Sequence, residues 1–428
     1  MTKPTGSQLQ YKVFITPLIS KNTYGNEIDV TQDIDISEVV TKNGIGKISQ
    51  QIDNGDYEFG VFTYSDLQLT AINRDGRFSD ENSYDSIFRF KRDKAKIRVD
   101  FVSQDNTVTI NFKGIINEEA TREDVTKGLI KFRVLSNSSI FRKTKVSGGS
   151  IANGTTFKNA LFSILNNTDI TAILNLDIDN IEVGIDLIID DGSAFDNLVV
   201  QEALNQLLVA SSSVLFVDDD DNIIITTRNN DNTTIYRFFG GQEVFGRENI
   251  LKLQNYNNGL HRLFNSVSVN NDLSEDPISI NINDLKRKNL SFNFITTELK
   301  NLSIANRILD DFKNLRAELE IKIRTNDSLN IKLLDNVVVE LTNLNKPAGD
   351  KEFFPQYGIN KYGEDFYPYI NNPVPIRKNQ IFRVIGIFED PKNFITTLKL
   401  RASGNFILVA GENLPVYGEA VYGEQVYQ

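Results

Sequence analysis

The chain has 428 residues, 40% hydrophobic and 24% charged, a composition typical of soluble globular proteins and long enough for two to four domains. It has no cysteine, which excludes disulfides, thiolate metal sites and cysteine nucleophiles, and its formal net charge of −11 argues against a surface that grips nucleic acid through the phosphates. No run approaches the roughly 20 apolar residues of a membrane helix, and the polar residues 1–5 lack the apolar core of a signal peptide.

The N-terminal block is predicted to consist of β-strands. Apolar and polar residues alternate over 96–101 and 107–112, which is the period of a strand with one buried face. Further strands are expected at 11–15, 56–62 and 129–135, with turns at 43–44, 53–55 and 73–76. Many short alternating strands favour a barrel or a sandwich, so residues 1–147 are predicted to form a first β-barrel.

Residues 148–229 are predicted to form a smaller α/β module. Thr156 can cap a helix whose apolar residues recur at helical spacing, namely Phe157, Ala160, Leu161, Ile164 and Leu165. A strand is expected at 184–189. A second helix, with Asp196 as its expected N-cap, has the same spacing at Val200, Ala203, Leu204, Leu207 and Leu208. Ser211 to Ser213 end this helix, and strands at 214–217 and 223–226 follow as a hairpin with a polar turn at 218–222.

Residues 230–412 are predicted to form a second β-barrel that includes a helix at 298–314. The expected strands lie at 263–269, 278–282, 317–323, 336–341, 381–387 and 394–401. An insert at 346–377, dense in aromatic residues and prolines, interrupts the strand pattern. Residues 413–428 form a tail with a short Val-Tyr-Gly-Glu repeat.

Candidate catalytic and metal sites are few. The only histidine is His261, so a Ser-His-Asp triad and multi-histidine metal sites are excluded within one chain. The acidic run at 218–221 suggests a calcium-binding loop. Counted from Asp218, however, the sixth position is Ile223 rather than Gly and the twelfth is Asn229 rather than Glu, so a solvated hairpin turn is favoured. No carboxylate pair is singled out by the sequence, and the lone pair Gly240-Gly241 indicates a turn rather than a phosphate loop. We therefore expect no catalytic residues, metal or cofactor.

Two surface features suggest contacts with partners. The densest basic cluster is Lys91, Arg92, Lys94, Lys96 and Arg98. Because the chain is acidic overall, a solvated or subunit-pairing face is favoured there over a nucleic-acid contact. The aromatic insert and the tail suit a rigid interface better than a core, with a core role as the alternative, and the predicted interface residues are Tyr357, Tyr362, Phe366, Tyr367, Tyr369, Tyr417 and Tyr422.

Several segments, taken in order, resemble a known family. They are NRDGRFSD at 73–80 with 88–99, FKGII at 112–116, EALNQLL at 202–208 with 214–227, and LDNVVV at 334–339 with 381–387 and 397–401. Their order resembles that of the tail hub, or baseplate hub, proteins of tailed bacteriophages. The aromatic insert and the C-terminal tail depart from the common pattern of that family.

The resemblance implies a fold that is mainly β with α+β inserts, in which two tail-tube-like β-barrels are separated by the small α/β module. It implies a homo-oligomer, a trimer being favoured over a hexamer, because three chains with two barrels each can close a six-fold tube and present three-fold symmetry to a tip. Its partners would be tail-tube and tip, spike or fibre proteins.

The function implied by the resemblance is structural and not enzymatic. The chain would form a hub ring in the virion tail, after synthesis in the host cytoplasm, and DNA would pass through without specific binding because an acidic lumen does not hold it. The alternatives are a hexameric distal tail protein and a glycan- or receptor-binding tail module.

Overall fold

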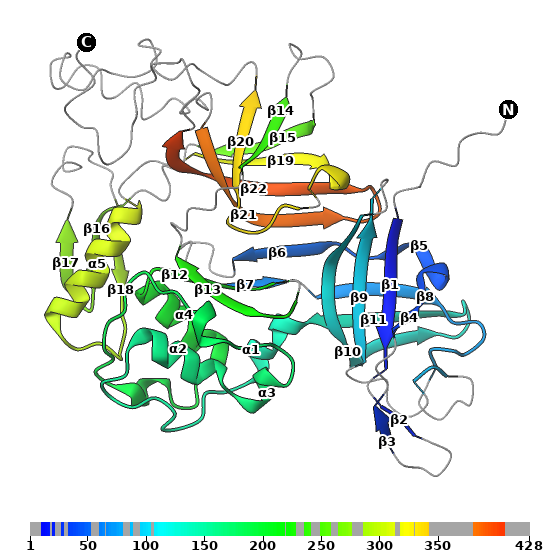
Figure 1. Cartoon of the computed structure of the whole chain (residues 1–428), viewed down its shortest axis with the longest axis horizontal. Helices are drawn as coiled ribbons and strands as arrows, with labels where there is room; N and C mark the ends of the chain where they lie inside the picture. Colours follow the sequence, from blue (N-terminus) through cyan, green and yellow to red (C-terminus); the bar gives the residue numbers. More distant parts are fainter. Residues whose placement is uncertain are drawn as a thin grey trace.

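The computed structural model describes residues 10–17, 19–21, 27–29, 33–52, 60–64, 66–79, 86–88, 95–103, 107–218, 220–227, 235–240, 249–257, 264–275, 286–312, 317–328, 330–341 and 380–406. These residues form two large β-sheets and one α/β unit (Figure 1). Each of the three has a hydrophobic core of its own. The fold is mainly β, as the sequence predicts.

The first sheet has seven strands in the order β4-β1-β9-β10-β11-β8-β5, all antiparallel. Its strands are β1 (Gln10–Thr16), β4 (Ile34–Asp35), β5 (Val40–Ile45), β8 (Leu67–Ile72), β9 (Lys96–Val102), β10 (Val108–Asp124) and β11 (Leu129–Ser136), with the 3-10 turn η1 (Ser37–Val39) before β5. A separate two-stranded sheet joins β2 (Ile19–Lys21) to β3 (Glu27–Asp29). The alternation predicted for 96–101 is confirmed, because Ile97 and Val99 are buried in the core of this sheet.

The second sheet has ten strands. Its main path is β13-β12-β7-β6-β21-β22-β19-β15, and β20 pairs with both β14 and β21. The strands are β6 (Ile48–Ile52), β7 (Gly60–Tyr64), β12 (Ser213–Val217), β13 (Ile223–Thr227), β14 (Ile235–Gly240), β15 (Ile250–Asn257), β19 (Glu318–Arg324), β20 (Asn336–Leu341), β21 (Gln380–Asp390) and β22 (Ile395–Phe406). Strands β6 and β7 come from the N-terminal part of the chain and pair here with strands from its middle and its end.

The α/β unit combines two segments of the chain. Its helices are α1 (Ile140–Lys143), α2 (Phe157–Leu165), α3 (Thr168–Thr171), α4 (Val200–Ala210) and α5 (Glu298–Phe312), and its small sheet joins β17 (Asp272–Glu275), β16 (Phe264–Val269) and β18 (Lys286–Leu290). The 3-10 turns η2 (Asn137–Ser139), η3 (Ile178–Asn180) and η4 (Gly192–Phe195) lie in its first segment, and η7 (Thr325–Ser328) follows β19. Leu161 of α2 and Leu204 of α4 share one core with Phe294 and with Ile308 of α5.

The hairpin of β12 and β13 belongs to two cores at once. Leu215 and Val217 are buried in the core of the α/β unit, whereas Val214 is buried in the core of the second sheet and Phe216 packs against it. This division follows from the strand period of two, which turns successive side chains to opposite faces. The hairpin is therefore the structural link between the α/β unit and the second sheet.

The predicted helix at 157–165 is confirmed together with its cap, since the Thr156 side chain accepts a hydrogen bond from the Asn159 N–H. The second predicted helix is also confirmed, but its expected N-cap is wrong. Helix α4 begins after Val199, and no side chain caps it. Asp196 instead ends the 3-10 turn η4 as its C-cap, four residues before α4 begins, and its carboxylate accepts from the Gly149 N–H at 2.8 Å.

Two further predictions are wrong for local reasons. The segment at 184–189 is not a strand, because its N–H groups bond to separate places: Gly184 to the Ser213 hydroxyl, Ile185 to the Ser211 carbonyl and Ile189 to the Thr155 carbonyl. The Asn-Gly pair at 43–44 is no turn but lies inside β5, where pairing with β8 is irregular. The predicted turn at 53–55 and strand at 278–282 lie outside the described residues.

Both large sheets are half-barrels, since neither strand order closes on itself among the residues that the structure describes. In that part of the chain, no helix is long and apolar enough to cross a membrane. The domain limits at residues 147, 229 and 412 stay predictions.

Candidate functional site

The residues predicted to form a partner interface all lie outside the described residues: Tyr357, Tyr362, Phe366, Tyr367, Tyr369, Tyr417 and Tyr422. The same holds for the insert at 346–377, the tail at 413–428 and His261. Their role stays a prediction.

The polar turn between β12 and β13 is held by its own side chains. The Asp218 carboxylate accepts from the N–H groups of Asp220 and Asn222, each at 2.9 Å, and from the Asn222 side-chain amide at 3.0 Å. Asp221 adopts a φ of 64°, which the tight turn requires. The interpretation of this stretch as a hairpin turn is confirmed. Nowhere in the described ranges do three or more His, Asp or Glu side chains gather where they could hold a metal ion.

The described members of the basic cluster are Lys96 and Arg98, both on β9. The Arg98 guanidinium pairs with Asp33 and with Asp100, the latter at 3.0 Å, and lies over the Phe14 ring at 4.5 Å. Burial raises the pKa of Asp100, although Arg98 lowers it in part. Because Asp100 on β9 and Asp33, which directly precedes β4, both engage Arg98, its charge is balanced by its neighbours within the chain.

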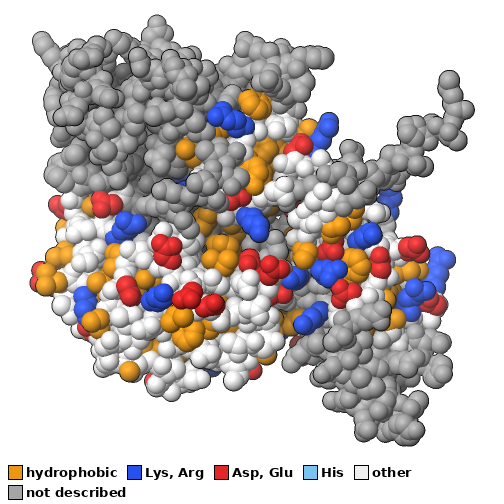
Figure 2. Space-filling model, in the orientation of Figure 1, with side chains coloured by type: hydrophobic (Ala, Val, Ile, Leu, Met, Phe, Trp, Pro, Cys, Tyr) orange, Lys and Arg blue, Asp and Glu red, His pale blue; other side chains and the backbone are white. Residues whose placement is uncertain are grey.

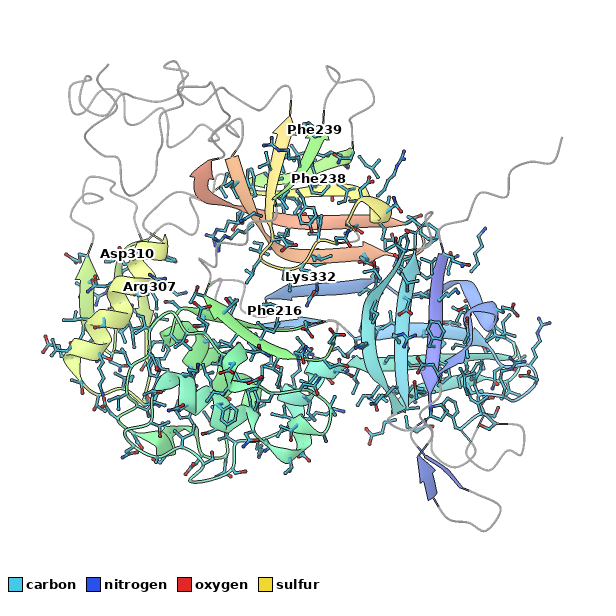
Figure 3. All side chains as sticks on the ribbon, viewed as in Figure 1. Phe216, Phe238, Phe239, Arg307, Asp310 and Lys332 are labelled. Carbon is cyan, nitrogen blue, oxygen red and sulfur yellow. The ribbon has the colours of Figure 1, made fainter. Side chains whose placement is uncertain are left out.

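A cavity of about 80 Å³ lies where the two large sheets and the hairpin of the α/β unit meet. The first sheet lines it with residues of β10, among them Asn111, and the second sheet with residues of β6 and β21, among them Glu389. Phe216 of the hairpin and Lys332 of the segment before β20 complete the wall, and both are labelled in Figure 3. This cavity marks the junction of all three parts of the fold.

The carboxyl group of Glu389, which lines this cavity, accepts hydrogen bonds from two residues of the first sheet. Its Oε2 accepts a hydrogen bond from the Asn111 side-chain amide at 2.5 Å and a longer one from the Tyr11 hydroxyl at 3.4 Å. Burial raises the pKa of Glu389 to about 7, and the two hydrogen bonds oppose that rise only in part. Burial, followed by the Glu389 charge, also raises the pKa of Tyr11, so its hydroxyl remains a donor at neutral pH.

An aromatic contact lies beside this carboxyl. The Tyr11 ring stacks on Phe394 with centroids 5.6 Å apart and meets the edge of Phe101 at 5.1 Å. Phe394 belongs to the turn between β21 and β22 and has a φ of 53°. The turn of the second sheet therefore places an aromatic ring against β1 and β9 of the first sheet.

A second polar contact joins the first sheet to the hairpin turn. The Asp221 carboxylate accepts from the Lys113 ammonium at 3.0 Å and from the Asn137 side-chain amide at 2.9 Å. The side chains of Lys113 and Asp221 are about one quarter exposed. Strand β10 thus contacts the second sheet through Asn111 and the α/β unit through Lys113.

A carboxylate also joins the two segments of the α/β unit. Asp190 accepts from the N–H groups and hydroxyls of Thr296 and Thr297, at 2.8 to 3.3 Å, and pairs with Lys300 of α5. Burial raises the pKa of Asp190, but the bonds from Lys300, Thr296 and Thr297 outweigh it and hold the pKa well below its usual range. Asp190 is in effect an N-terminal anchor for α5.

The acidic surplus of the chain is concentrated in one place. Residues 146–227 contain thirteen Asp and Glu and one Lys, whereas the rest of the chain contains 44 Asp and Glu and 45 Lys and Arg. Acidic side chains gather on the face of the α/β unit that Figure 2 shows. Apart from β12 and β13, the strands of the two sheets therefore belong to a nearly neutral part of the chain.

These side chains act as connectors within the fold. Glu389 and Asp221 join the first sheet to other parts of the fold, and Asp190 joins the two segments of the α/β unit, so the described geometry supports a scaffold that connects the two half-barrels. Sequence reasoning missed all three. Asp221 and Asp190 lie in acidic, turn-like stretches that predict solvent exposure, and no local pattern distinguishes Glu389 from a solvated residue at a strand end.

No family model and no curated protein matches the chain. Among solved structures, a tail protein from Neisseria meningitidis MC58 aligns with a TM-score of 0.54 at 11% identity, over 92% of this chain and 98% of that one. A 43 kDa tail protein of prophage MuSo2 from Shewanella oneidensis aligns with a TM-score of 0.49 at 11% identity, over 91% and 97%. Prophage tail protein gp18 from Listeria monocytogenes EGD-e aligns with a TM-score of 0.49 at 9% identity, over 92% and 94%. The first of these shows a shared fold.

Proposed function

We propose that the chain is a structural protein of a phage tail and forms the hub ring that joins the tail tube to the tip or spike. The observation that carries this proposal is the fold shared with the Neisseria tail protein over 92% of this chain and 98% of that one. The resemblance of the segments at 73–80, 202–208 and 334–339 to hub proteins supports it independently.

The architecture suits a ring in which two symmetries meet. One chain carries two half-barrel sheets that the junction contacts of Glu389 and Asp221 join to each other and to the α/β unit. Three such chains supply six sheets, which suits a tube of six-fold symmetry on one side and a three-fold tip on the other. We propose a homotrimer in the virion tail, made in the host cytoplasm, with the predicted interface residues contacting a neighbouring subunit or tail protein.

The charge distribution supports a channel that lets DNA pass. A basic lining would hold DNA through its phosphates by releasing counterions. Apart from β12 and β13, the strands of the two sheets belong to the part of the chain in which acidic and basic residues balance, and the acidic surplus lies in residues 146–227. A channel lined by the sheets would therefore offer DNA no net positive surface. We propose that the role is mechanical, without a catalytic step.

Native mass spectrometry of the purified chain tests the proposed assembly. We expect a species of three times the 48.4 kDa chain mass. A species of six times that mass would favour the distal tail protein, and a chain that stays monomeric at high concentration would contradict the ring. A glycan array tests the receptor-binding alternative, for which the hub proposal predicts no specific signal.

A further inference from the structure

The two polar contacts of the first sheet described above, at Asp221 and at Glu389, differ in character. The contact of Lys113 and Asn137 with Asp221 joins a full ammonium–carboxylate pair at 3.0 Å. The contact of Asn111 and Tyr11 with Glu389 joins a carboxyl to two neutral donors. The first contact is an ion pair with both charges balanced, whereas the second contains no positive charge to balance an ionised carboxyl.

The geometry of β10 is adapted to the second contact. Pairing between β9 and β10 shifts between Ile110 and Phe112, which makes Asn111 the extra residue of a β-bulge. A bulge turns a side chain away from the regular alternation of a strand. Here it accompanies the 2.5 Å hydrogen bond from the Asn111 amide to Glu389.

We propose that Glu389, Asn111 and Tyr11 form a proton-controlled latch, which closes the first sheet onto the second when Glu389 is protonated and loosens when Glu389 ionises. Both donors go to Oε2, so in the closed state the proton is carried by Oε1. The latch can be tested without an assembled ring, because all of its parts lie within one chain.

The surroundings of Glu389 explain the direction of the switch. Asp218 and Lys332 line the same cavity, Asp390 follows in the chain, and Tyr11 faces the carboxyl from β1. Within the described ranges, the structure contains no ion pair between Glu389 and a basic side chain. An ionised Glu389 therefore has two neutral donors to stabilise it, and this half-buried side chain gains further water as the joint opens around the cavity.

The pKa of Glu389 gives the range over which the latch operates. In the closed state burial raises this pKa to about 7, against 4.5 for an ordinary Glu. The closed state thus holds its proton more tightly, so closure is strongest below pH 4.5, weakens as the pH rises, and reaches a constant lower value above about pH 7. The pKa difference corresponds to a change in the closing equilibrium on the order of 100-fold.

The chain connections permit a change of angle rather than separation. The chain crosses from the first sheet to the second between β5 and β6, through a short link at 46–47, and it returns to the first sheet between β7 and β8. These links and the Asp221 contact remain when the Glu389 contact is lost. Opening is therefore a hinge motion about the links.

Distance measurements between two spin labels test the latch. The chain has no cysteine, so Lys131→Cys on β11 and Lys252→Cys on β15 give two exposed, unique labelling positions, one on each sheet. Labelled chain is diluted with unlabelled chain so that distances within one molecule dominate. We expect the distance distribution to change between pH 5.5 and 8.5, with a midpoint below pH 7, because closure reaches its lower plateau above that value.

Three variants in this labelled background make the test specific. Glu389→Gln cannot ionise, so its distribution should stay closed at both pH values. Asn111→Ala removes the shorter bond and should broaden the distribution already at pH 5.5. Glu202→Gln, which removes an exposed carboxylate from α4, should keep the wild-type transition. Circular dichroism verifies that each variant is folded.

A wild-type distribution that does not change over this pH range would overturn the latch. So would a transition of equal size and midpoint in Glu389→Gln. If Glu389→Gln does not fold, the distance distribution of Asn111→Ala at pH 5.5 decides the test. A distribution equal to that of the wild type at this pH contradicts the proposal.

Discussion

Replacing Asp190 by Ala should loosen the start of helix α5. The substitution removes every acceptor for the N–H groups and hydroxyls of Thr296 and Thr297 and leaves Lys300 without its carboxylate. Loss of a capping side chain costs about 0.5–2 kcal/mol, and hydrogen bonds to a charged group contribute about 1.5–3 kcal/mol each when buried. Because both ionic side chains are about one fifth exposed, water compensates part of this loss. We estimate a local cost of about 2 kcal/mol.

Hydrogen exchange followed by mass spectrometry measures this cost locally, which matters because a chain with several cores need not unfold in two states. A cost of about 2 kcal/mol corresponds to exchange about 30-fold faster in the peptides covering 294–304. Asp179→Ala, which removes an exposed carboxylate from the same unit, is the matched control and should leave these peptides unchanged. Equal exchange in wild type and Asp190→Ala, or equal acceleration in both variants, would refute the reasoning.

The same contact predicts a pH dependence. The pKa of Asp190 is lowered in the folded chain, so its stabilising contribution is fully present above the ordinary Asp value and is lost as the pH falls toward the folded pKa. The difference between wild type and Asp190→Ala should therefore be constant between pH 5 and 8 and should shrink below about pH 4.

Three further substitutions or deletions give sharp expectations. Gly192→Ala would place a Cβ 2.1 Å from a backbone carbonyl oxygen and should destabilise the α/β unit by about 1–3 kcal/mol, whereas Gly148→Ala, whose nearest atom is 3.9 Å away, should melt like wild type. Phe294→Ala removes a fully buried ring from the core and should cost about 3–5 kcal/mol in chemical denaturation, while Leu299→Ala, 76% exposed, should cost little. Deleting 414–428 should leave the melting profile unchanged but impair tail assembly, and normal yields of infectious particles from the truncated chain would contradict the interface role of the tail.

Local periodicity predicts much of this fold. The spacing of apolar residues correctly identifies α2, α4 and α5. The period of two identifies β9, and two short apolar runs on either side of a polar turn identify β12 and β13. These patterns succeed because one face of each element is buried whatever the partner is. Prediction fails where the pattern is short, or where the backbone N–H groups of a segment donate to scattered acceptors instead of to one neighbouring strand. Residues 184–189 are an example.

Long-range partners could not be predicted. Nothing within β6 and β7 shows that they pair with β21 and β12, which are more than 150 residues away in the chain. Nothing in the sequence around Glu389 indicates that Tyr11 and Asn111 meet it. Strand pairing and burial of this kind depend on contacts between residues that are far apart in the sequence, and no local pattern in a single sequence reveals such contacts.

A cryo-EM reconstruction of the assembled oligomer tests the central claim most directly, because it shows both the symmetry and the position of the sheets. The account predicts a ring of three chains in which six half-barrel sheets surround a channel wide enough for DNA, with the α/β units farther from the axis. A reconstruction without a ring, or with the sheets turned away from a central channel, would contradict it.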